Sequence, residues 1–536
     1  MAVNESNLIN AAIQLEVIDA ESVSLLRQQA RRERLKLLDV VMREKRLPLT
    51  AFYQSLAVQR GMPFLTLAEL QVDEGLLKKI PTNLLSRRLL LPVTQQGKVL
   101  LAVADPDDQV SVDSVKRILG GSVEAALAEP AALKSALQLA LGEGDGNAEV
   151  GEPVALLDQI MQDAYIRRAS DIHFEPGRTG LKVRMRIDGH LQDYPRFFSR
   201  SEAEGLLNRI KVLSGLDISE SRMPQDGGFA YHIDAWDVPQ TDIRLATIPS
   251  RFGERATMRI LGQADEQLGL DDLGMPGALL QEFRTRLKQP HGIVLVTGPT
   301  GSGKSTTLYG ALREIDKSEH NVLTVEDPIE QVIEGVSQVQ VSNKVSFASA
   351  LRSFLRHDPD IILVGEIRDL ETADTALKAA MTGHLVLSTL HTNDAASAAT
   401  RLADLGSENY LIASTLVGVL AQRLVRRLCT QCREPFIINS EQQQLLGVGE
   451  GTKVYRPKGC PSCLSAGYSG RVGLYEAMWV DEGLARAIAQ GENAFELRKK
   501  AKYLQSLWQD ARSKVLEGVT SLDEVIMLAY QRESLS

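Results

Sequence analysis

A strand that runs directly into a glycine-rich loop and then into a helix limits most strongly what this chain can fold into. Residues 291–297, HGIVLVT, have the apolar character of a buried strand, and GPTGSGKS follows at 298–305. The next segment, TTLYGALREI, is predicted to be a helix. Glycines let backbone N–H groups turn inward around phosphates, and a helix N-terminus adds partial positive charge. The pattern predicts a nucleotide phosphate loop, and a glycine-rich turn without a ligand is the alternative.

The positions of this loop have separate expected tasks. We expect Lys304 to contact the β- and γ-phosphates of ATP, and Ser305 to hold Mg²⁺. The residues predicted to contact the nucleotide are Gly298, Pro299, Thr300, Gly301, Ser302, Gly303, Lys304, Ser305 and Thr306.

Two acidic clusters follow predicted strands at suitable distances from the loop. Residues 321–325 lead into EDPIE at 326–330, and residues 360–364 lead into GEIRD at 365–369. Ligands of open α/β sheets lie beyond the carboxyl ends of the strands, so both clusters can face the phosphates. We predict Glu330 and Glu366 to be catalytic carboxylates, with solvated loop acids as the alternative.

Two histidines flank one further predicted strand. His384 precedes the strand 385–390 and His391 follows it. A role for both in sensing the γ-phosphate is one interpretation. Packed or hydrogen-bonded histidines without catalytic work are the other.

The cysteines of the chain occur as two C-x-x-C pairs, Cys429 with Cys432 and Cys460 with Cys463. Four thiolates in two such pairs suit tetrahedral Zn²⁺. Four protein ligands leave no open position for water, so the sequence predicts a structural zinc site. A redox pair or free thiols are the alternatives.

The length of 536 residues predicts several domains, because a single core does not grow to that size. The Gly-rich, acidic stretch around residue 145 is typical of a linker. We expect a multidomain α/β protein with the following parts: an N-terminal α/β docking module 1–142, a linker 143–153, a second α/β domain 154–262, a linker 263–275, and a domain 276–536 that includes a cysteine segment 424–475 and C-terminal helices 476–536.

The net charge of -9 argues against nucleic acid as the main partner, although Arg423, Arg426, Arg427 and Arg433 form a local basic patch. The N-terminus has no secretory signal, and no apolar run reaches the roughly 18 residues of a membrane span. We therefore expect a cytoplasmic chain that reaches a membrane only through partners.

Taken together, the phosphate loop, the acidic clusters, the strand with flanking histidines and the cysteine pairs resemble those of the ATPases that power type II secretion and type IV pilus extension. The resemblance runs from about residue 89 to the C-terminus, and the tetracysteine insert is similar to that of assembly motors rather than of retraction motors. The matching blocks are ASDIHFEP (169–176), VRMRIDG (183–189), RIKVLSGLDISESRMPQDG (209–227), GPTGSGKSTT (298–307), LTVEDPIE (323–330), LRHDPDIILVGEIRD (355–369), TGHLVLSTLHTND (382–394) and GYSGRVGLYE (467–476).

The resemblance implies a homo-hexameric motor with a RecA-like P-loop core, a preceding PAS-like domain and nucleotide bound between the two. Glu330 would activate water, and Glu366 would be the acid of the Walker B-like strand. Arg222 and Arg244 would reach the nucleotide, with surface salt bridges as the alternative. The implied partners are an inner-membrane platform protein and a cytoplasmic or membrane-anchored adaptor.

The blocks around the cysteines favour type II secretion, and type IV pilus extension is the alternative. A nucleic-acid translocase and a scaffold that binds ATP without hydrolysing it are further readings. Relatives that bind cyclic di-GMP carry N-terminal motifs that begin Arg-Leu-Gly, whereas this chain has Lys36 after Arg34 and Leu35. Because the missing glycine would allow close approach of the ligand, regulation by cyclic di-GMP is not expected.

Overall fold

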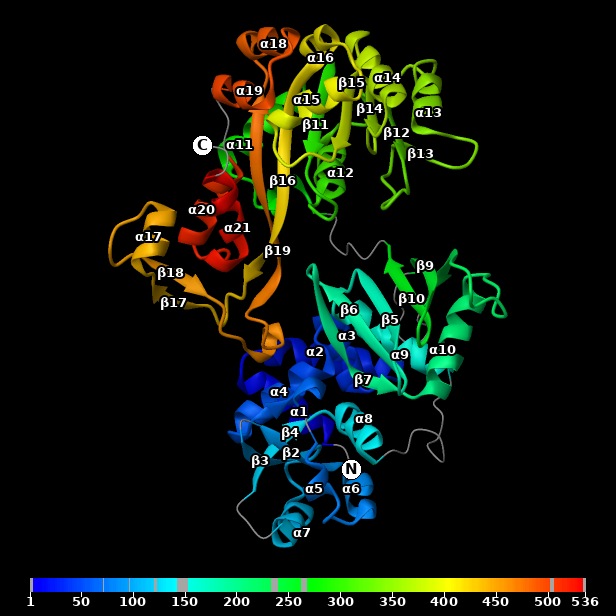
Figure 1. The fold of residues 1–536 in the computed structure, drawn as a ribbon, viewed down its shortest axis with the longest axis vertical. Coiled ribbons are helices and arrows are strands. Elements are labelled where there is room, and N and C mark those ends of the chain that lie inside the picture. The colour runs from blue at the N-terminus through cyan, green and yellow to red at the C-terminus, as the bar shows by residue number, and fades with distance from the viewer. Residues whose placement is uncertain are drawn as a thin grey trace. The chain divides into compact units, whose positions relative to one another are not determined.

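The computed structural model describes residues 3–70, 72–95, 97–119, 123–141, 153–232, 240–261, 268–501 and 506–533. The chain forms two compact units, residues 1–263 with 459–466 and residues 264–458 with 467–536, and Figure 1 labels their helices and strands. The predicted linker 143–153, except for Pro153, and the start of the predicted linker 263–275 lie outside the described residues. No helix within the described ranges is both long and apolar enough to cross a membrane.

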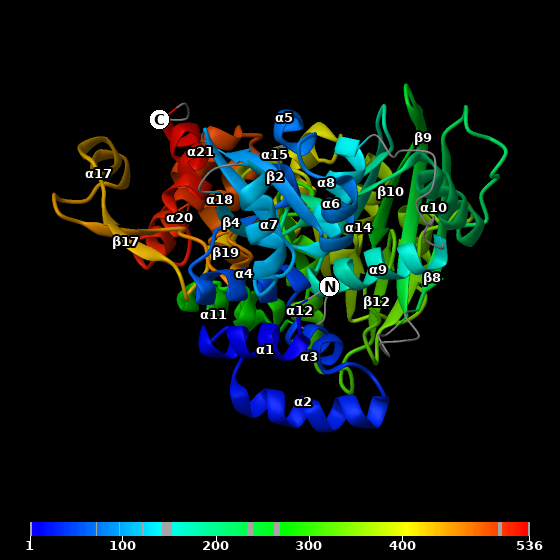
Figure 2. The ribbon, with the colours of Figure 1, turned by 90° about the horizontal axis from the view of Figure 1, so that it is seen from below.

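The first unit begins with four helices, as the helical periodicity of its N-terminal segment predicts. They are α1 (Glu5–Gln14), α2 (Ala20–Glu33), α3 (Leu37–Lys45) and α4 (Leu49–Arg60). Asn4 caps α1 by accepting the backbone N–H of Ser6. Asp19 caps α2 in the same way through Ser22. Figure 2 shows α1, α2 and α3 side by side, and α4 is buried along 51–57.

A small mixed sheet follows these helices. Its order is β1-β4-β3-β2. The antiparallel pair β2 and β3 places Gln95 opposite Lys98, as the predicted hairpin requires; Gln96 itself lies outside the described residues. The elements are β1 (Phe64–Leu65), α5 (Glu74–Leu77), α6 (Thr82–Arg88), β2 (Leu90–Gln95), β3 (Lys98–Val103), α7 (Gln109–Leu119), β4 (Glu124–Ala128) and α8 (Pro130–Leu141).

The rest of the first unit is an antiparallel sheet of order β7-β6-β5-β10-β9-β8. Residues alternate between buried and more exposed along β6 and β9, so one face packs on α9 and α10 while the other stays open. The elements are α9 (Pro153–Ile166), β5 (Asp171–Pro176), β6 (Leu181–Ile187), β7 (His190–Phe198), α10 (Arg200–Leu213), β8 (Gln225–Tyr231), β9 (Thr241–Ser250) and β10 (Gly253–Ile260).

The second unit is built on a seven-stranded sheet of order β13-β12-β14-β15-β11-β16-β19, parallel except for β19. Helices α11 and α12 cover one face, and α13 to α16 cover the other. The predicted α/β class is thereby confirmed. The elements are α11 (Gly277–Leu287), β11 (Gly292–Thr297), α12 (Lys304–Glu314), β12 (Val322–Glu326), β13 (Ser337–Gln340), α13 (Phe347–Phe354), β14 (Ile361–Val364), α14 (Leu370–Met381), β15 (Leu385–Leu390), α15 (Ala396–Asp404), α16 (Asn409–Thr415), β16 (Leu416–Leu428) and β19 (Tyr468–Trp479).

Two predicted boundaries fall inside regular structure. The cysteine segment begins within β16 and ends within β19, because these long antiparallel strands continue out of the sheet. Residues 476–479 are therefore strand rather than helix. Leu270, expected in a linker, is fully buried in a short 3-10 helix against Gly310 of α12. The remaining elements are β17 (Glu434–Ile437), α17 (Ser440–Leu446), β18 (Lys453–Arg456), α18 (Glu482–Ala489), α19 (Ala494–Lys500), α20 (Leu507–Leu516) and α21 (Leu522–Glu533).

Candidate nucleotide site and cysteine cluster

The predicted phosphate loop is a tight turn between β11 and α12. Gly298, Gly301 and Gly303 have φ angles of 149°, 76° and 85°, in the region that favours glycine. A Cβ at Gly298 would lie 2.3 Å from the carbonyl oxygen of Gln422 and 2.6 Å from Ser302 Oγ. Helix α12 begins directly after the loop, so its first backbone N–H groups are available to an anion. The conformation suits phosphate binding.

Lys304 is a largely buried cation at the first position of α12. Its Nζ donates to the carbonyl oxygens of Gly298 at 2.8 Å and Pro299 at 3.1 Å. Burial lowers the pKa of Lys304, and the charge of Glu366 opposes that shift. The neighbouring Ser305 is exposed. Lys304 therefore lies against the loop and within electrostatic reach of a predicted catalytic carboxylate.

Glu366 and His391 lie next to each other at the same edge of the sheet. Glu366 Oε2 is 3.4 Å from His391 Nε2, and Glu366 also pairs with Arg368. Because β15 lies between β14 and β11, the residues that follow these three parallel strands meet at one edge. The structure thus brings together the phosphate loop, Glu366 and His391.

His384 is at the other end of β15, which differs from the expected pairing of the two histidines. Its backbone carbonyl accepts from Gly292 N–H at the start of β11, and its Nδ1 is 2.8 Å from Ala379 O. Seven residue steps along a strand separate His384 from His391 by roughly 23 Å. A residue that precedes a parallel strand lies at the opposite edge of the sheet from one that follows it, so the two histidines do not meet at one edge. The γ-phosphate role of each histidine stays a prediction.

Glu330 is exposed on the segment after β12, and its backbone N–H donates to Tyr309 Oη of α12 at 3.1 Å. Glu326, in the same acidic cluster, is buried instead. Its carboxylate accepts from Thr324 Oγ1 at 2.6 Å and is bonded to Tyr309 Oη and Gln338. Glu326 therefore supports the fold, whereas Asp327 and Glu330 of this cluster are exposed. The catalytic role of Glu330 stays a prediction.

The structure adds residues that no sequence motif indicated. Thr297 ends β11, and its Oγ1 is 2.7 Å from Thr392 Oγ1 just beyond β15. Gln422 of β16 accepts from Thr307 Oγ1 of α12 at 2.7 Å. These side chains support the phosphate loop from two neighbouring strands. Their signal in the sequence was a polar residue within or at the end of an apolar strand.

Arg222 and Arg244 are exposed residues of the first unit. Arg244 stands opposite Arg259 on the open face of the antiparallel sheet. Arg259 is 3.0 Å from Asp171, and Glu175 is 2.9 Å from Arg255 on the same face. Among the described residues, no carboxylate pairs with Arg244, so its charge is available to a ligand. The proposed contact of both arginines with nucleotide stays a prediction.

The basic patch around the first cysteine pair is largely engaged within the protein. Arg426 forms hydrogen bonds of 3.1 and 2.6 Å to Glu524 Oε1, and its guanidinium lies 3.9 Å from the centre of the Tyr468 ring. Arg433 donates to Gly518 O and lies over Tyr455. Arg427 is exposed. These contacts tie α21, and the turn before it, to β16 and to the segment that follows β16, and they reduce the charge available to nucleic acid.

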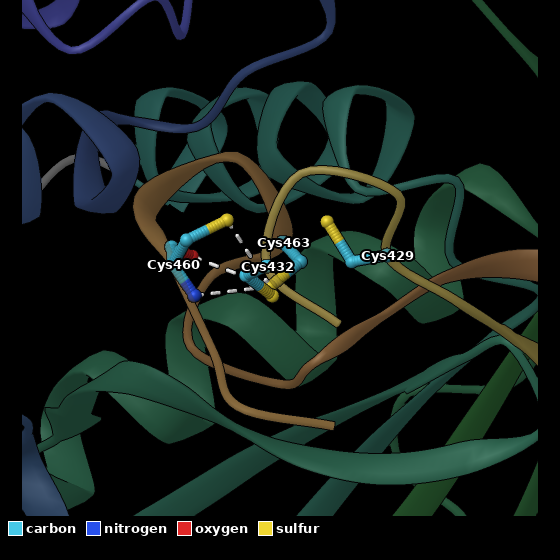
Figure 3. Close-up of side chains that lie close together, drawn as sticks. All are labelled: Cys429, Cys432, Cys460 and Cys463. Atoms are coloured by element: carbon cyan, nitrogen blue, oxygen red, sulfur yellow. Dashed lines mark hydrogen bonds between the residues drawn. The ribbon is translucent and has the colours of Figure 1, made fainter. Parts of the chain in front are cut away.

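The four cysteines form one cluster, shown in Figure 3. Their Sγ atoms all lie within 4.8 Å of one another, and Cys460 Sγ is 3.7 Å from Cys463 Sγ. Tetrahedral Zn²⁺ with Zn–S bonds of about 2.3 Å requires sulfur separations of about 3.8 Å. Three of the cysteines are buried. The donor set and its spacing therefore fit zinc.

Two family models match the chain. The model described as Type II/IV secretion system protein matches residues 147–527, and the MshEN domain matches residues 60–147. The chain is 46% identical over 392 residues to the type II secretion system protein E of Dickeya dadantii, covering 73% of this chain and 77% of that protein. It is 37% identical over 525 residues to the type IV pilus assembly ATPase PilB of Thermus thermophilus, covering 92% of this chain and 59% of that protein's length.

Among solved structures, the ATPase DotB of Legionella pneumophila is similar, with a TM-score of 0.54 and 24% identity over 72% of this chain and 98% of DotB. At this identity the likeness shows the fold, and it agrees with the parallel sheet of the second unit. The family match covers the phosphate loop, both acidic clusters and all four cysteines, and it confirms the resemblance of the sequence blocks. The chain belongs to the type II/IV secretion system protein family.

Proposed function

We propose that this chain is a homo-hexameric ATPase motor that drives assembly of the type II secretion pseudopilus at the inner membrane. Type IV pilus extension is the alternative, because relatives named for both machines match over most of the chain. The family assignment makes the chain an ATP-hydrolysing P-loop enzyme. The observation that carries the proposal is the meeting of Lys304, Glu366 and His391 at one edge of the parallel sheet.

The residues of this edge have complementary tasks in phosphoryl transfer. Lys304 and the loop N–H groups neutralise the β- and γ-phosphates. Ser305 and Glu366 would hold Mg²⁺, which would supply further positive charge to the transferring phosphoryl group. Glu330 orients the attacking water and accepts its proton. His391, held beside Glu366, contacts the γ-phosphate oxygens from the end of β15.

Other parts of the chain are assigned supporting tasks in the same proposal. Arg222 and Arg244 bring positive charge to the nucleotide from the domain 154–262. Residues 1–142 dock onto a cytoplasmic or membrane-anchored adaptor, and the motor pushes on an inner-membrane platform protein. The stretches 143–153 and 263–275 serve as linkers, apart from the buried 3-10 helix. Zn²⁺ held by the four cysteines stabilises the insert and takes no part in hydrolysis.

Phosphate release by the purified full chain tests the hydrolytic part of the proposal. Glu330→Gln is expected to lower kcat by about 100-fold or more while ATP still binds, because the water loses its general base. Glu334→Gln is the matched control, since Glu334 is an exposed acid four residues further along the same segment. Equal rates for wild type and Glu330→Gln would contradict the motor assignment, and stimulation by single-stranded DNA or RNA would favour a translocase.

Complementation separates the two machines. The gene is introduced into a strain that lacks its type II secretion ATPase and into a strain that lacks its pilus-extension ATPase. Restored secretion with no surface pili supports the favoured branch. Restored pili with no secretion overturns it in favour of pilus extension.

A further inference from the structure

The segment 391–395 after β15 is hydrogen-bonded at its first end to the last residue of β11, which directly precedes the phosphate loop. Thr392 N–H donates to Thr297 Oγ1 at 2.9 Å, and the two hydroxyl groups are 2.7 Å apart. Thr297 is fully buried and directly precedes Gly298. A displacement of Thr392 would therefore move the residue from which the phosphate loop starts.

The other end of this segment forms an ion pair with α19. Asp394 accepts the N–H and Oγ–H of Ser397, in the first turn of α15, at 2.9 and 2.7 Å, and its carbonyl accepts from Thr392 Oγ1 at 3.0 Å. Arg498 of α19 lies 3.3 Å from Asp394 Oδ1. Helix α19 also packs against α15. A chain of direct contacts thus joins α19 to Thr392.

A buried carboxylate contacts both the end of segment 391–395 and Arg498. Glu476 of β19 is 2% exposed. Its Oε1 accepts Ala395 N–H at 2.9 Å, its Oε2 accepts Leu507 N–H at the start of α20 at 3.3 Å, and Arg498 is 3.5 Å away. A buried charge is costly unless it is paired and hydrogen-bonded. Burial raises the pKa of Glu476, and the charge of Arg498 opposes that shift.

We propose that Arg498 and Glu476 are positioning residues for the phosphate loop, which act through Asp394 and Thr392. The inference rests on the proposed ATPase function, and it adds to that function a second group of residues that positions the phosphate loop. Helix α19 would set the position of segment 391–395, and this segment would set the start of the phosphate loop and the side chain of His391. ATP binding would in turn be felt at α19, because coupling between two sites is reciprocal.

The coupling is tested by a double-mutant cycle in the full chain. Arg498→Ala and Thr392→Val are each expected to raise the KM for ATP about fivefold, and the double variant is expected to be no worse than the more affected single variant. Arg498→Lys, which keeps the charge, should recover part of the loss. Arg486→Ala on α18 is the control, since its ion pair with Glu482 is exposed at the surface.

A purely structural role predicts a different pattern. In one such pattern, thermal midpoints fall in both single variants while KM and kcat of the remaining folded protein stay at wild-type values. In another, the two substitutions act independently, and the KM of the double variant rises by the product of the two single-variant increases. Either result overturns the proposal. If Arg498→Ala does not fold, Arg498→Lys is compared with wild type by hydrogen exchange of the Thr392 amide, where faster exchange without ATP and protection with ATP are expected.

The failure of this inference is distinguishable from the failure of the proposed function. A wild-type chain that does not release phosphate contradicts the ATPase proposal alone. Binding of a fluorescent ATP analogue then replaces KM in the same cycle. Unchanged affinity in Arg498→Ala would overturn the positioning role in that case as well.

Discussion

Glu366 Oε2 lies 3.4 Å from His391 Nε2, although the two residues follow different strands. We predict that His391→Asn lowers kcat about tenfold or more, because Glu366 loses a neighbour and the γ-phosphate loses a donor. His384→Asn removes the other histidine that flanks β15, at the opposite end of the strand, and should leave kcat unchanged. Steady-state phosphate release by both variants checks the prediction, and equal losses would restore the original pairing of the two histidines.

The glycines of the phosphate loop should differ in their tolerance of a methyl group. A Cβ at Gly298 meets Gln422 O and Ser302 Oγ, whereas a Cβ at Gly301 meets no protein atom within 4 Å. Gly298→Ala is predicted to distort the loop and to abolish measurable ATP binding. Gly301→Ala adds mainly backbone strain of about 1 kcal/mol, since its φ is positive. Calorimetric titration with ATP, together with thermal midpoints, compares the variants. Similar affinities in both would show that the loop relaxes around the clash.

We predict that His173 makes the first unit sensitive to acid. Burial lowers the pKa of His173 below its ordinary 6.5, and the charge of Asp171 only partly opposes the shift. The folded state therefore favours the neutral ring, so this stability is present above pH 6.5 and is lost as pH falls from 6.5 through the lower folded-state pKa. We expect His173→Asn to lose less stability than wild type between about pH 7.5 and about pH 5.5.

The comparison for His173 uses thermal midpoints at both pH values. His190→Asn is the control, because this histidine is exposed on the same sheet. An identical pH dependence in wild type and His173→Asn would mean that other groups cause the acid sensitivity.

Metal analysis tests the cysteine cluster. We expect one Zn²⁺ per chain in the purified protein, and Cys432→Ser should reduce the content well below that, because a tetrahedral site loses one of its four thiolates. The thermal midpoint should fall in parallel, since metal binding contributes to folding. Ser462→Ala alters the second C-x-x-C pair without removing a ligand, so this variant should keep the metal. Full zinc content in Cys432→Ser would exclude a four-cysteine site.

Arg426 should stabilise the junction between the long strands and the C-terminal helices. Arg426→Ala leaves Glu524 without its cation and removes the contact with the Tyr468 ring. We expect a loss of about 1–3 kcal/mol, as for other half-buried charged hydrogen bonds. The neighbouring Arg427 is exposed, so Arg427→Ala should change stability by less than about 0.5 kcal/mol. Urea unfolding monitored by tryptophan fluorescence distinguishes the variants.

The parts of the site that the sequence predicted are those set by local pattern. The strand, loop and helix around Gly298 were predictable because apolar run, glycines and helix signal stand in contiguous order. The position of Glu366 was predictable because it follows a buried strand, and the catalytic role of Glu330 stays a prediction. The cysteine cluster was predictable from the repetition of one short spacing.

The parts that could not be predicted depend on strand order. The insertion of β15 between β11 and β14 places His391, at the end of β15, beside Glu366 and the phosphate loop. The contact of Thr297 with Thr392 joins residues 95 positions apart, and no local periodicity encodes it. Arg498 and Glu476 come together only because β19 and α19 pack on the same core.

Strand β16 carries Gln422 beside the phosphate loop and, seven residues later, reaches Cys429. The strand thereby acts as a molecular ruler of roughly 23 Å. Adding one residue after Gln422 would invert every later side chain and turn Arg426 away from Glu524. Only additions of two residues, matched in β19, would preserve the facing of both strands. An engineered variant of this family can therefore change the reach of its cysteine hairpin only in steps of about 7 Å.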